Sequence, residues 1–323
     1  MSRFTTLRSI LRHLVLASLP LAAACGCPEP TEATVVLDPD SEKLNELVER
    51  CDLQSDCEEL CRTVVDMLEG PGTAFNVSFS ICELSTLPNE TRPVVHYEYA
   101  PECIGGRRPD GLCVASAGAR NDQVIGAWFA RLAHLEAASV HAFVGIAREL
   151  RAFGAPRGLV QRALKAARDE IRHAWLVGAL ALRYGAEPIV PAVEPPHPRP
   201  LLAFAIENAA EGCVRETFGA MVAAWQARAA SDPVVRAAMT RIADDESRHA
   251  ELSLAIDRWA RARLDAAAWN RVEVARRKAV VELAASAASA PAPALMRHAG
   301  LPNAEAATRL IANARQTIWA HAA

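Results

Sequence analysis

The chain of 323 residues is long enough to bury a large hydrophobic core and to hold more than one folded part. It carries 35 Lys and Arg residues against 38 Asp and Glu residues, which gives a formal net charge of -3. Its basic residues form no tract of the kind that follows a phosphate backbone, so the sequence argues against a nucleic-acid-binding protein.

Residues 1–24 have the parts of a signal peptide for export. Arginines precede an apolar run over 14–21 that is too short to span a bilayer, and alanines at 22–24 precede Cys25. The segment resembles a bacterial lipoprotein signal peptide, which implies that Cys25 carries lipid and anchors the protein to a membrane of the cell envelope, at the periplasmic face or in the outer membrane. Ala22 stands where that pattern usually has Leu, and the alanines also suit the ordinary secretory peptidase, whose product would be secreted or periplasmic.

Cysteine usage agrees with export, because all but one of the nine cysteines lie at or before Cys113. With Cys25 set aside for lipid, those from Cys51 onward can pair as disulfides, although the sequence does not decide the partners. A metal cluster is the competing interpretation, and the lack of any Cys-x-x-Cys spacing argues against it. We therefore predict a small disulfide-rich domain over 28–117, with the disulfide candidates Cys51, Cys57, Cys61, Cys82, Cys103 and Cys113.

Within this domain the sequence predicts a tether over 28–40 and one helix over 41–69, which ends at the Gly-Pro-Gly of 70–72. From 74 to 99 the pattern changes to alternating apolar and polar residues, which predicts β-strands.

Four long helices are predicted between 121 and 264. The first begins at the cap Asn121 and ends near Ala152, and the second runs from Pro156 to Tyr184. The third covers 201–229 and the fourth 232–264. The proline-rich segment between helices two and three can span roughly 45 Å in extended form, about the length of a 30-residue helix. One long crossover between two helical hairpins predicts a mainly α protein with a ferritin-like four-helix bundle.

Residues 265–323 form a helical extension, with helices predicted over 267–288 and 303–319. These helices pack either on the bundle or on a second copy of the chain, in which case the protein is a homo-oligomer.

Two stretches, 168–174 and 244–250, read as copies of one another, and each sets a Glu three residues before a His. Residues three apart share a helix face, so each copy presents a carboxylate beside an imidazole, which is a metal-ligating unit. A further glutamate beside an apolar stripe lies 34 residues before the Glu of the first copy and 35 before that of the second. The predicted metal ligands are Glu136, Glu170, His173, Glu211, Glu246 and His249.

The charges of this set indicate two metal ions. Four carboxylates bring four negative charges, which two divalent ions balance. Buried without metal, these acids would cost several kcal/mol each unless they were protonated or paired. Mixed carboxylate and imidazole ligands suit iron or manganese better than zinc. In the competing interpretation the motif residues are solvated and pair with Arg172 and Arg248, but this leaves the upstream glutamates unexplained.

The arrangement resembles the ferritin-like superfamily of di-iron carboxylate proteins, and AlaGluGlyCysValArgGluThrPhe at 210–218 is similar to the third-helix segment of rubrerythrins. The resemblance covers about Asp122 to Leu264. It implies two iron ions, or manganese in their place, and dioxygen or peroxide as the reactant. It also implies that Asp169 and Asp245, which precede the motif glutamates, orient ligand histidines.

Three features depart from the rubrerythrin pattern. No cysteine follows Cys213, so a rubredoxin-like site for electron entry is missing and the electron donor is unknown. Phe143 stands where rubrerythrins have a tyrosine, and Val214 stands where they can have a further ligand glutamate. Any redox cycle therefore needs an outside electron source or stops at oxidation of the metal itself.

Three nearby residues are expected to have other roles. His141 and Glu216 each lie five residues after an upstream glutamate, about 140° around the helix, so we expect them to support ligands rather than to bind metal. Glu207 lies one turn before Glu211 on the same face and is the candidate for an additional ligand.

Three functions fit these features. The first is an exported, membrane-anchored di-iron oxidoreductase with ferroxidase-like or peroxidase-like activity. The second is an iron-binding protein that sequesters metal without a substrate reaction. The third is a structural or interaction lipoprotein of the envelope, built on a metal-free ferritin-like scaffold. Metal content separates the third function from the other two.

Overall fold

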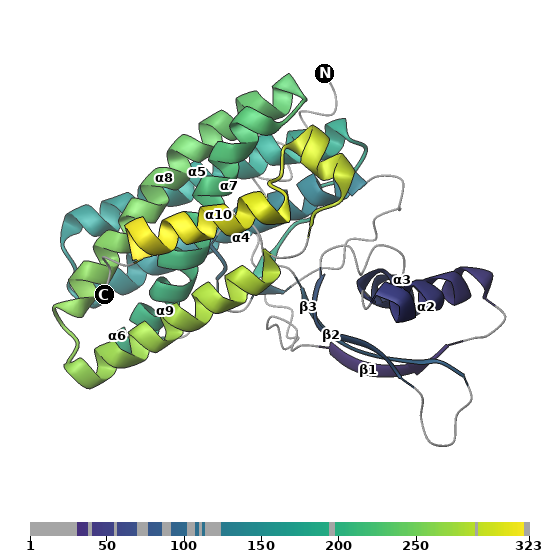
Figure 1. The fold of residues 1–323 in the computed structure, drawn as a ribbon. Coiled ribbons are helices and arrows are strands. Elements are labelled where there is room, and N and C mark those ends of the chain that lie inside the picture. The colour runs from purple at the N-terminus through teal and green to yellow at the C-terminus, as the bar shows by residue number, and fades with distance from the viewer. Residues whose placement is uncertain are drawn as a thin grey trace. The chain divides into compact units, whose positions relative to one another are not determined.

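The computed structural model divides the described chain into two compact units (Figure 1). The small unit lies within Gly26–Cys103, and the helical unit comprises Ile104–Ala115 and Gln123–Ala323. The expected signal peptide and Cys25 lie outside the described residues. The structure describes residues 31–37, 41–54, 57–69, 77–85, 92–101, 107–109, 112–113, 124–193, 198–287 and 290–319.

The small unit contains an antiparallel sheet in which β3 (Val94–Pro101) lies between β1 (Thr31–Val36) and β2 (Val77–Ser85). β2 and β3 occupy the alternating stretch for which strands are predicted. The prediction of a tether over 28–40 is wrong for residues 31–36, which form β1. The β-branched residues of β1 pair along β3, with Val35 opposite Val95.

Two helices, α2 (Glu42–Gln54) and α3 (Glu58–Glu69), replace the single helix expected over 41–69. A disulfide joins Cys51 to Cys57, whose Cα atoms lie 4.5 Å apart. In a continuous α-helix these atoms would be separated by about 9 Å along the axis alone. The helix must therefore break between the two cysteines for the disulfide to form.

A second disulfide joins Cys61 on α3 to Cys82 on β2 and fixes the helices to the sheet. Apolar side chains of α2, α3 and β3 form the core of the small unit around this bond. The two disulfides confirm that cysteines in this region pair. Of the other candidates, Cys103 and the side chain of Cys113 lie outside what the structure describes.

In the helical unit, α4 (Val124–Ala152) and α5 (Arg157–Arg183) form a hairpin close to the predicted bounds. The chain reverses after α4 at Gly154, whose φ of 68° is a left-handed conformation that suits glycine. The expected cap Asn121 lies outside the described residues.

The third predicted helix is a continuous helical stretch with a change of form in its middle. It consists of α6 (Leu201–Glu207), the π-helix η3 (Asn208–Glu216) and α7 (Thr217–Ala229). The sequence predicts the helix but not the π segment, in which backbone hydrogen bonds close over one more residue than in an α-helix. α8 (Pro233–Arg261) follows, and Asp232 caps it by accepting a hydrogen bond from the Val234 N–H at 2.8 Å.

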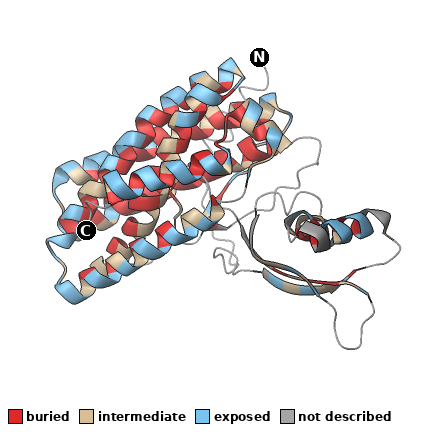
Figure 2. Ribbon diagram, viewed as in Figure 1, coloured by how far each residue is buried: buried red, intermediate tan, exposed pale blue. Residues whose placement is uncertain are grey.

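These helices pack side by side: α4 along α5, α7 and η3 along α8, and α5 against α8. Their facing sides carry the buried residues and their outer sides are exposed (Figure 2). Large side chains such as Phe143, Phe204 and Ile256 fill the core between them. The unit is mainly helical, as predicted.

A short two-stranded ladder holds the segment that precedes α4 on the helical unit. β5 (Ala192–Val193), in the segment after α5, pairs with β4 (Leu112–Cys113), and Leu112 packs against Leu135 and Ala138 of α4. The expected domain boundary at 117 assigned this segment to the cysteine-rich domain. Pairing with β5, which the sequence does not predict, places it in the helical unit instead.

The C-terminal helices pack within the same chain. α9 (Ala266–Ser286) contacts α6 and η3, and α10 (Ala304–Ala314) contacts α7. Two short π-helical turns, η4 (Leu295–Ala299) and η5 (Arg315–Trp319), precede and follow α10. Among the described residues, no helix has both the length and the apolar character needed to cross a membrane.

Candidate metal centre

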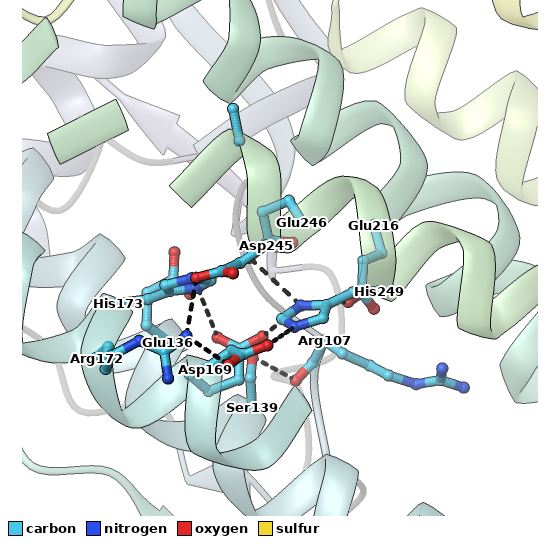
Figure 3. Close-up of polar contacts among 12 residues, drawn as sticks. Arg107, Glu136, Ser139, Asp169, Arg172, His173, Glu216, Asp245, Glu246 and His249 are labelled. Atoms are coloured by element: carbon cyan, nitrogen blue, oxygen red, sulfur yellow. Dashed lines mark hydrogen bonds and ion pairs between the residues drawn. The ribbon is translucent and has the colours of Figure 1, made fainter. Parts of the chain in front are cut away.

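A buried cluster of carboxylates and imidazoles lies between α4, α5, η3 and α8 (Figure 3). It consists of two overlapping groups, and within each group the potential ligand atoms all lie within 4.8 Å of one another. Glu170 of α5 and Glu246 of α8 belong to both groups. The first group adds Glu136 and His173, and the second adds Glu216 and His249.

Both imidazoles direct Nδ1 toward the shared carboxylates. The Nδ1 atom of His173 lies 3.0 Å from a carboxylate oxygen of Glu246 and 3.5 Å from one of Glu136. The Nδ1 atom of His249 lies 3.1 Å from Glu170 and 3.5 Å from Glu216. Nδ1 is therefore the atom that each histidine offers to a metal ion.

The other ring nitrogens reach across to the opposite helix. Nε2 of His173, on α5, lies 3.2 Å from Oδ2 of Asp245 on α8. Nε2 of His249, on α8, lies 3.5 Å from Oδ2 of Asp169 on α5. The structure thus places each aspartate beside the histidine of the other motif copy, and this exchange ties α5 to α8. A carboxylate at Nε2 favours a proton there and leaves Nδ1 free for a metal.

Two arginines cover the outer side of these aspartates. Arg172 donates to Asp169 at 2.5 Å and to Asp245 at 3.1 Å. Arg248 donates to Asp245 and lies 3.9 Å from Asp169. Pairing with arginines is thus a property of the aspartates, whereas the competing interpretation assigned it to the motif Glu and His residues, which are buried.

The pKa values of the carboxyl groups shift in different directions, because burial and neighbouring carboxylates raise them while the imidazoles lower them. Burial raises the pKa of Glu136, and the charge of Glu170 raises it further. Burial also raises the pKa of Glu216, to about 7. For Glu170, burial is outweighed by the neighbouring His173 and His249, which hold its pKa well below the usual range. The cluster therefore favours unequal protonation of its acids.

The histidines are shifted toward the charged form. Burial disfavours the imidazolium of His173, but the contacts with Glu136, Glu170 and Glu246 dominate and raise its pKa to about 12. Burial lowers the pKa of His249, but the charge of Glu246 and the contacts with three other carboxylates together raise it well above its ordinary value. Positive charge is strongly favoured inside this cluster, whether protons or metal ions supply it.

The polar atoms of the cluster fit a metal ion better than they fit one another. Several are fully buried and make no well-formed hydrogen bond within the described part of the chain. Buried polar atoms in proteins nearly always have partners, so such a group points to a bound species. These atoms are Oε2 of Glu136, both carboxylate oxygens of Glu170 and Glu216, Oε1 of Glu246, and Nδ1 of His173 and His249.

Of the six residues predicted as ligands, the structure brings five together and leaves Glu211 apart. Glu211 pairs with Arg215, which also binds Glu282 of α9 at 2.7 Å. Glu216, expected to support the ligands, lies inside the cluster instead. The assignment of Glu211 followed from nearly equal spacing along α-helices, and the π-helical segment that contains both residues breaks the α-helical periodicity.

Glu207, the candidate for an additional ligand, and His141, expected to support ligands, both lie outside the two groups of potential ligands. Glu207 is held away from the cluster by a two-pronged ion pair with the buried Arg107, at 2.9 and 3.0 Å, and by Arg199 at 3.2 Å. His141 is half-buried on α4, and neither group of potential ligands includes it. Burial and the charge of Arg148 lower the pKa of His141.

Arg107 is the residue near the centre that the sequence does not reveal. The residue is 1% exposed, and its side chain also donates to Asn208 at 3.2 Å and to Ser253 at 3.4 Å, while Ser139 donates to its carbonyl at 2.9 Å. An arginine in a short loop usually lies at the surface, so no local signal marks it. The β4–β5 pairing, a few residues further along the chain, helps to hold this loop on the helices.

Comparison of the chain with protein-family models, curated proteins and solved structures finds no significant match.

Proposed function

We propose that the helical unit is a ferritin-like four-helix bundle that binds two iron ions. The four helices are α4, α5, the α6–η3–α7 stretch and α8, and the segment after α5 is the long crossover. One ion is held by Glu136 and His173, and the other by Glu216 and His249. Glu170 and Glu246 serve both ions. Manganese is the alternative metal, because the same ligand types suit it.

The observation that carries this proposal is the overlap of the two groups through Glu170 and Glu246. A single ion does not need six buried ionisable ligands, whereas two ions use four carboxylates and two imidazoles fully. The charges agree, because four carboxylates balance two divalent ions.

We assign the protein as an oxidoreductase that reacts with dioxygen or peroxide, with ferroxidase-like or peroxidase-like activity. Two bound irons supply the electrons for such a reaction. The chain orients the ligands through Asp169 and Asp245, and buried apolar side chains such as Phe143 belong to the core of the same helices. The ring of Phe143 lies 5.0 Å from that of His249 and, unlike a phenol, has no proton to give. The reducing electrons then come from outside the centre.

The protein acts outside the cytosol in this proposal. The two disulfides of the small unit indicate a non-cytoplasmic location, because such bonds rarely persist in a reducing compartment. Export through the N-terminal signal, with lipid on Cys25 as the membrane anchor, accounts for this location.

Metal analysis of the purified full chain, combined with the optical spectrum of its oxidised form, tests the proposal. We expect two iron ions per chain after anaerobic loading with ferrous iron and exposure to air. Fewer than one iron or manganese ion per chain, with no uptake on reconstitution, would favour a structural or interaction protein.

Peroxide separates the oxidoreductase from an iron-sequestering protein. We expect the reduced, iron-loaded protein to be oxidised rapidly by peroxide and to be reduced again over several cycles without loss of iron. Release of the iron or accumulation of more than two ions per chain would instead indicate storage or sequestration.

A further inference from the structure

The exposed side of α5 carries charges of one sign. Its exposed charged residues are all basic, whereas its two acids, Asp169 and Glu170, are buried. At about 100° per residue, all of these basic residues except Arg162 fall within an arc of about 80°. We call this set the basic face: Arg157, Arg162, Lys165, Arg168, Arg172 and Arg183.

Composition does not explain the basic face. The whole chain has a formal charge of -3, and exposed acids do occur on the neighbouring α8, at Asp244 and Glu251. A surface of one sign raises the local concentration of partners of the opposite sign and speeds their association.

At Arg172 the basic face is connected to the buried cluster by a short chain of polar contacts. The side chain of Arg172 is 56% exposed, and its Nη2 atom donates to Oδ2 of Asp245 at 3.1 Å. The same carboxylate oxygen lies 3.2 Å from Nε2 of His173, and Nδ1 of that ring faces the shared carboxylates. Two short contacts therefore connect solvent to a ligand of the centre.

The second histidine is reached in the same way. Arg248 of α8 is 44% exposed on its side chain and contacts both Asp245 and Asp169. Asp169 lies 3.5 Å from Nε2 of His249. Arg172 and Arg248 thus mark the place on this surface where both histidines connect to the exterior through hydrogen-bonding groups.

We infer that the basic face, together with Arg248, is the docking surface for an acidic one-electron carrier protein that reduces the metal centre. This inference rests on the proposed di-iron function and supplies the outside electron source that it needs. Each docked carrier loses one electron and is oxidised, and one ferric ion gains it and becomes ferrous. Two carriers in turn reduce a diferric pair.

The placement of the charges favours a redox partner over an anionic lipid surface. Lipid binding needs positive charge but gains nothing from a position over the histidines. An electron carrier needs both the positive charge and the position over the histidines. Its own redox group must approach the centre closely while opposite charges hold the two proteins together.

Charge reversal on the basic face tests the inference. The double variant Lys165→Glu/Arg168→Glu changes two exposed residues that contact neither the cluster nor its aspartates in the described structure. Arg271→Glu/Arg277→Glu on α9 is the matched control, with the same change in net charge at two other exposed arginines. Metal content and circular dichroism establish that both variants fold and load.

The first measurement is binding of a plant-type [2Fe–2S] ferredoxin, used as an acidic carrier, to the full chain by titration calorimetry at low ionic strength. We expect binding to both the metal-free and the iron-loaded protein, weakened at least tenfold in the α5 variant but not in the α9 control. Added salt should weaken the wild-type complex, because exposed charges are screened. No binding to the wild type, or equal binding by both variants, would overturn the inference.

The second measurement is the rate at which reduced ferredoxin reduces the oxidised centre, followed by stopped-flow spectroscopy. We expect the α5 variant to be slowed at least tenfold at low ionic strength, with an unchanged rate of reduction by dithionite, a small reductant. Selective loss of binding to phosphatidylglycerol vesicles, without any effect on ferredoxin, would assign the face to lipid and overturn the inference. Failure of the metal centre itself is seen separately, as absence of bound iron.

Discussion

Glu211 and Glu216 lie five residues apart in one helical stretch, and only Glu216 joins the buried cluster. Both are glutamates of the same π-helical segment, so their chemistry does not distinguish them. The difference is the direction in which the backbone turns each side chain. Glu211 points to Arg215 and α9, whereas Glu216 lies 3.5 Å from His249.

Replacing each glutamate by alanine in turn measures this difference. We expect Glu216→Ala to reduce bound iron from two ions per chain to about one, because the second group loses a ligand that only this helix supplies. Glu211→Ala is the matched control and should retain both ions. Elemental analysis of the two loaded proteins checks this, and loss of iron by the Glu211 variant alone would restore the ligand set expected from the sequence.

In the proposed metal centre, the aspartates would act on the metal through the histidines. We expect Asp245→Asn to weaken metal binding by roughly 10- to 100-fold, because a neutral amide holds the Nε2 proton of His173 less strongly. Asp244→Asn removes the same charge from the adjacent, exposed position and should leave affinity unchanged. Competition with a chelator gives both affinities, and equal weakening in the two variants would show a general charge effect instead.

The π-helix η3 makes close contacts with other parts of the chain on two sides. On one side Arg107 and Ser253 lie so close to Gly212 that a Cβ atom there would come within 2.7 Å of Nη1 and 2.6 Å of Oγ. On the other, Trp319 donates its indole N–H to the carbonyl of Cys213 at 2.8 Å. These contacts come from distant parts of the chain and stabilise the segment that presents Glu216.

Substitution of Gly212 tests this packing. We expect Gly212→Ala to destabilise the protein by about 1–3 kcal/mol, because the added methyl group overlaps buried neighbours. Gly219→Ala in α7 is the control, since a Cβ there meets nothing within 4 Å, and alanine should stabilise that helix by roughly 0.5–1 kcal/mol. Denaturant unfolding of the metal-free proteins measures both changes, and a neutral Gly212 variant would contradict the close packing.

The end of α5 is tied to the start of α8 by Tyr184, whose hydroxyl donates to Asp232 at 2.7 Å. We expect Tyr184→Phe to lower the free energy of unfolding by about 0.5–1.5 kcal/mol at neutral pH. Burial and the Asp232 carboxylate raise the pKa of Tyr184 from 10.0 to about 12. The advantage of the wild type is therefore fully present below pH 10 and is lost as pH rises toward 12. Parallel denaturant titrations of the two proteins across this range check the sign, and a constant difference would contradict it.

At the scale of the whole molecule, the two units are stabilised by different means. Both described disulfides lie in the small unit, whereas the described helical unit depends on its apolar core and on ion pairs such as Arg276 with Asp257 at 2.8 Å. A small domain with a limited core commonly needs such cross-links.

Reduction of the disulfides should therefore destabilise the small unit and leave the stability of the helical unit unchanged. We expect a phosphine reductant to make the small unit sensitive to protease while the helical unit keeps the iron loaded into it, because the candidate ligands of the buried cluster include no thiol. Limited proteolysis with metal analysis of the surviving fragment measures this. Loss of iron in step with disulfide reduction would show that the units depend on one another.

The sequence predicted the helices around the buried cluster and five of its residues, because these features are local. A helix repeats about every 3.6 residues, so a Glu three residues before a His shares its face whatever the rest of the chain does. The same period marks the apolar stripes that bury α4 and α8. The disulfide-rich character of the small unit likewise follows from residue type and count.

Only the tertiary structure decided which glutamate of the third helix joins the cluster, which aspartate serves which histidine, and that Arg107 is buried. Each depends on contacts between segments far apart in the sequence. The π-helix is held by groups about 100 residues away on either side, and the aspartates reach across from α5 to α8. The periodicity of a sequence fixes which residues share a helix face, but the packing of helices against one another determines which side chains meet.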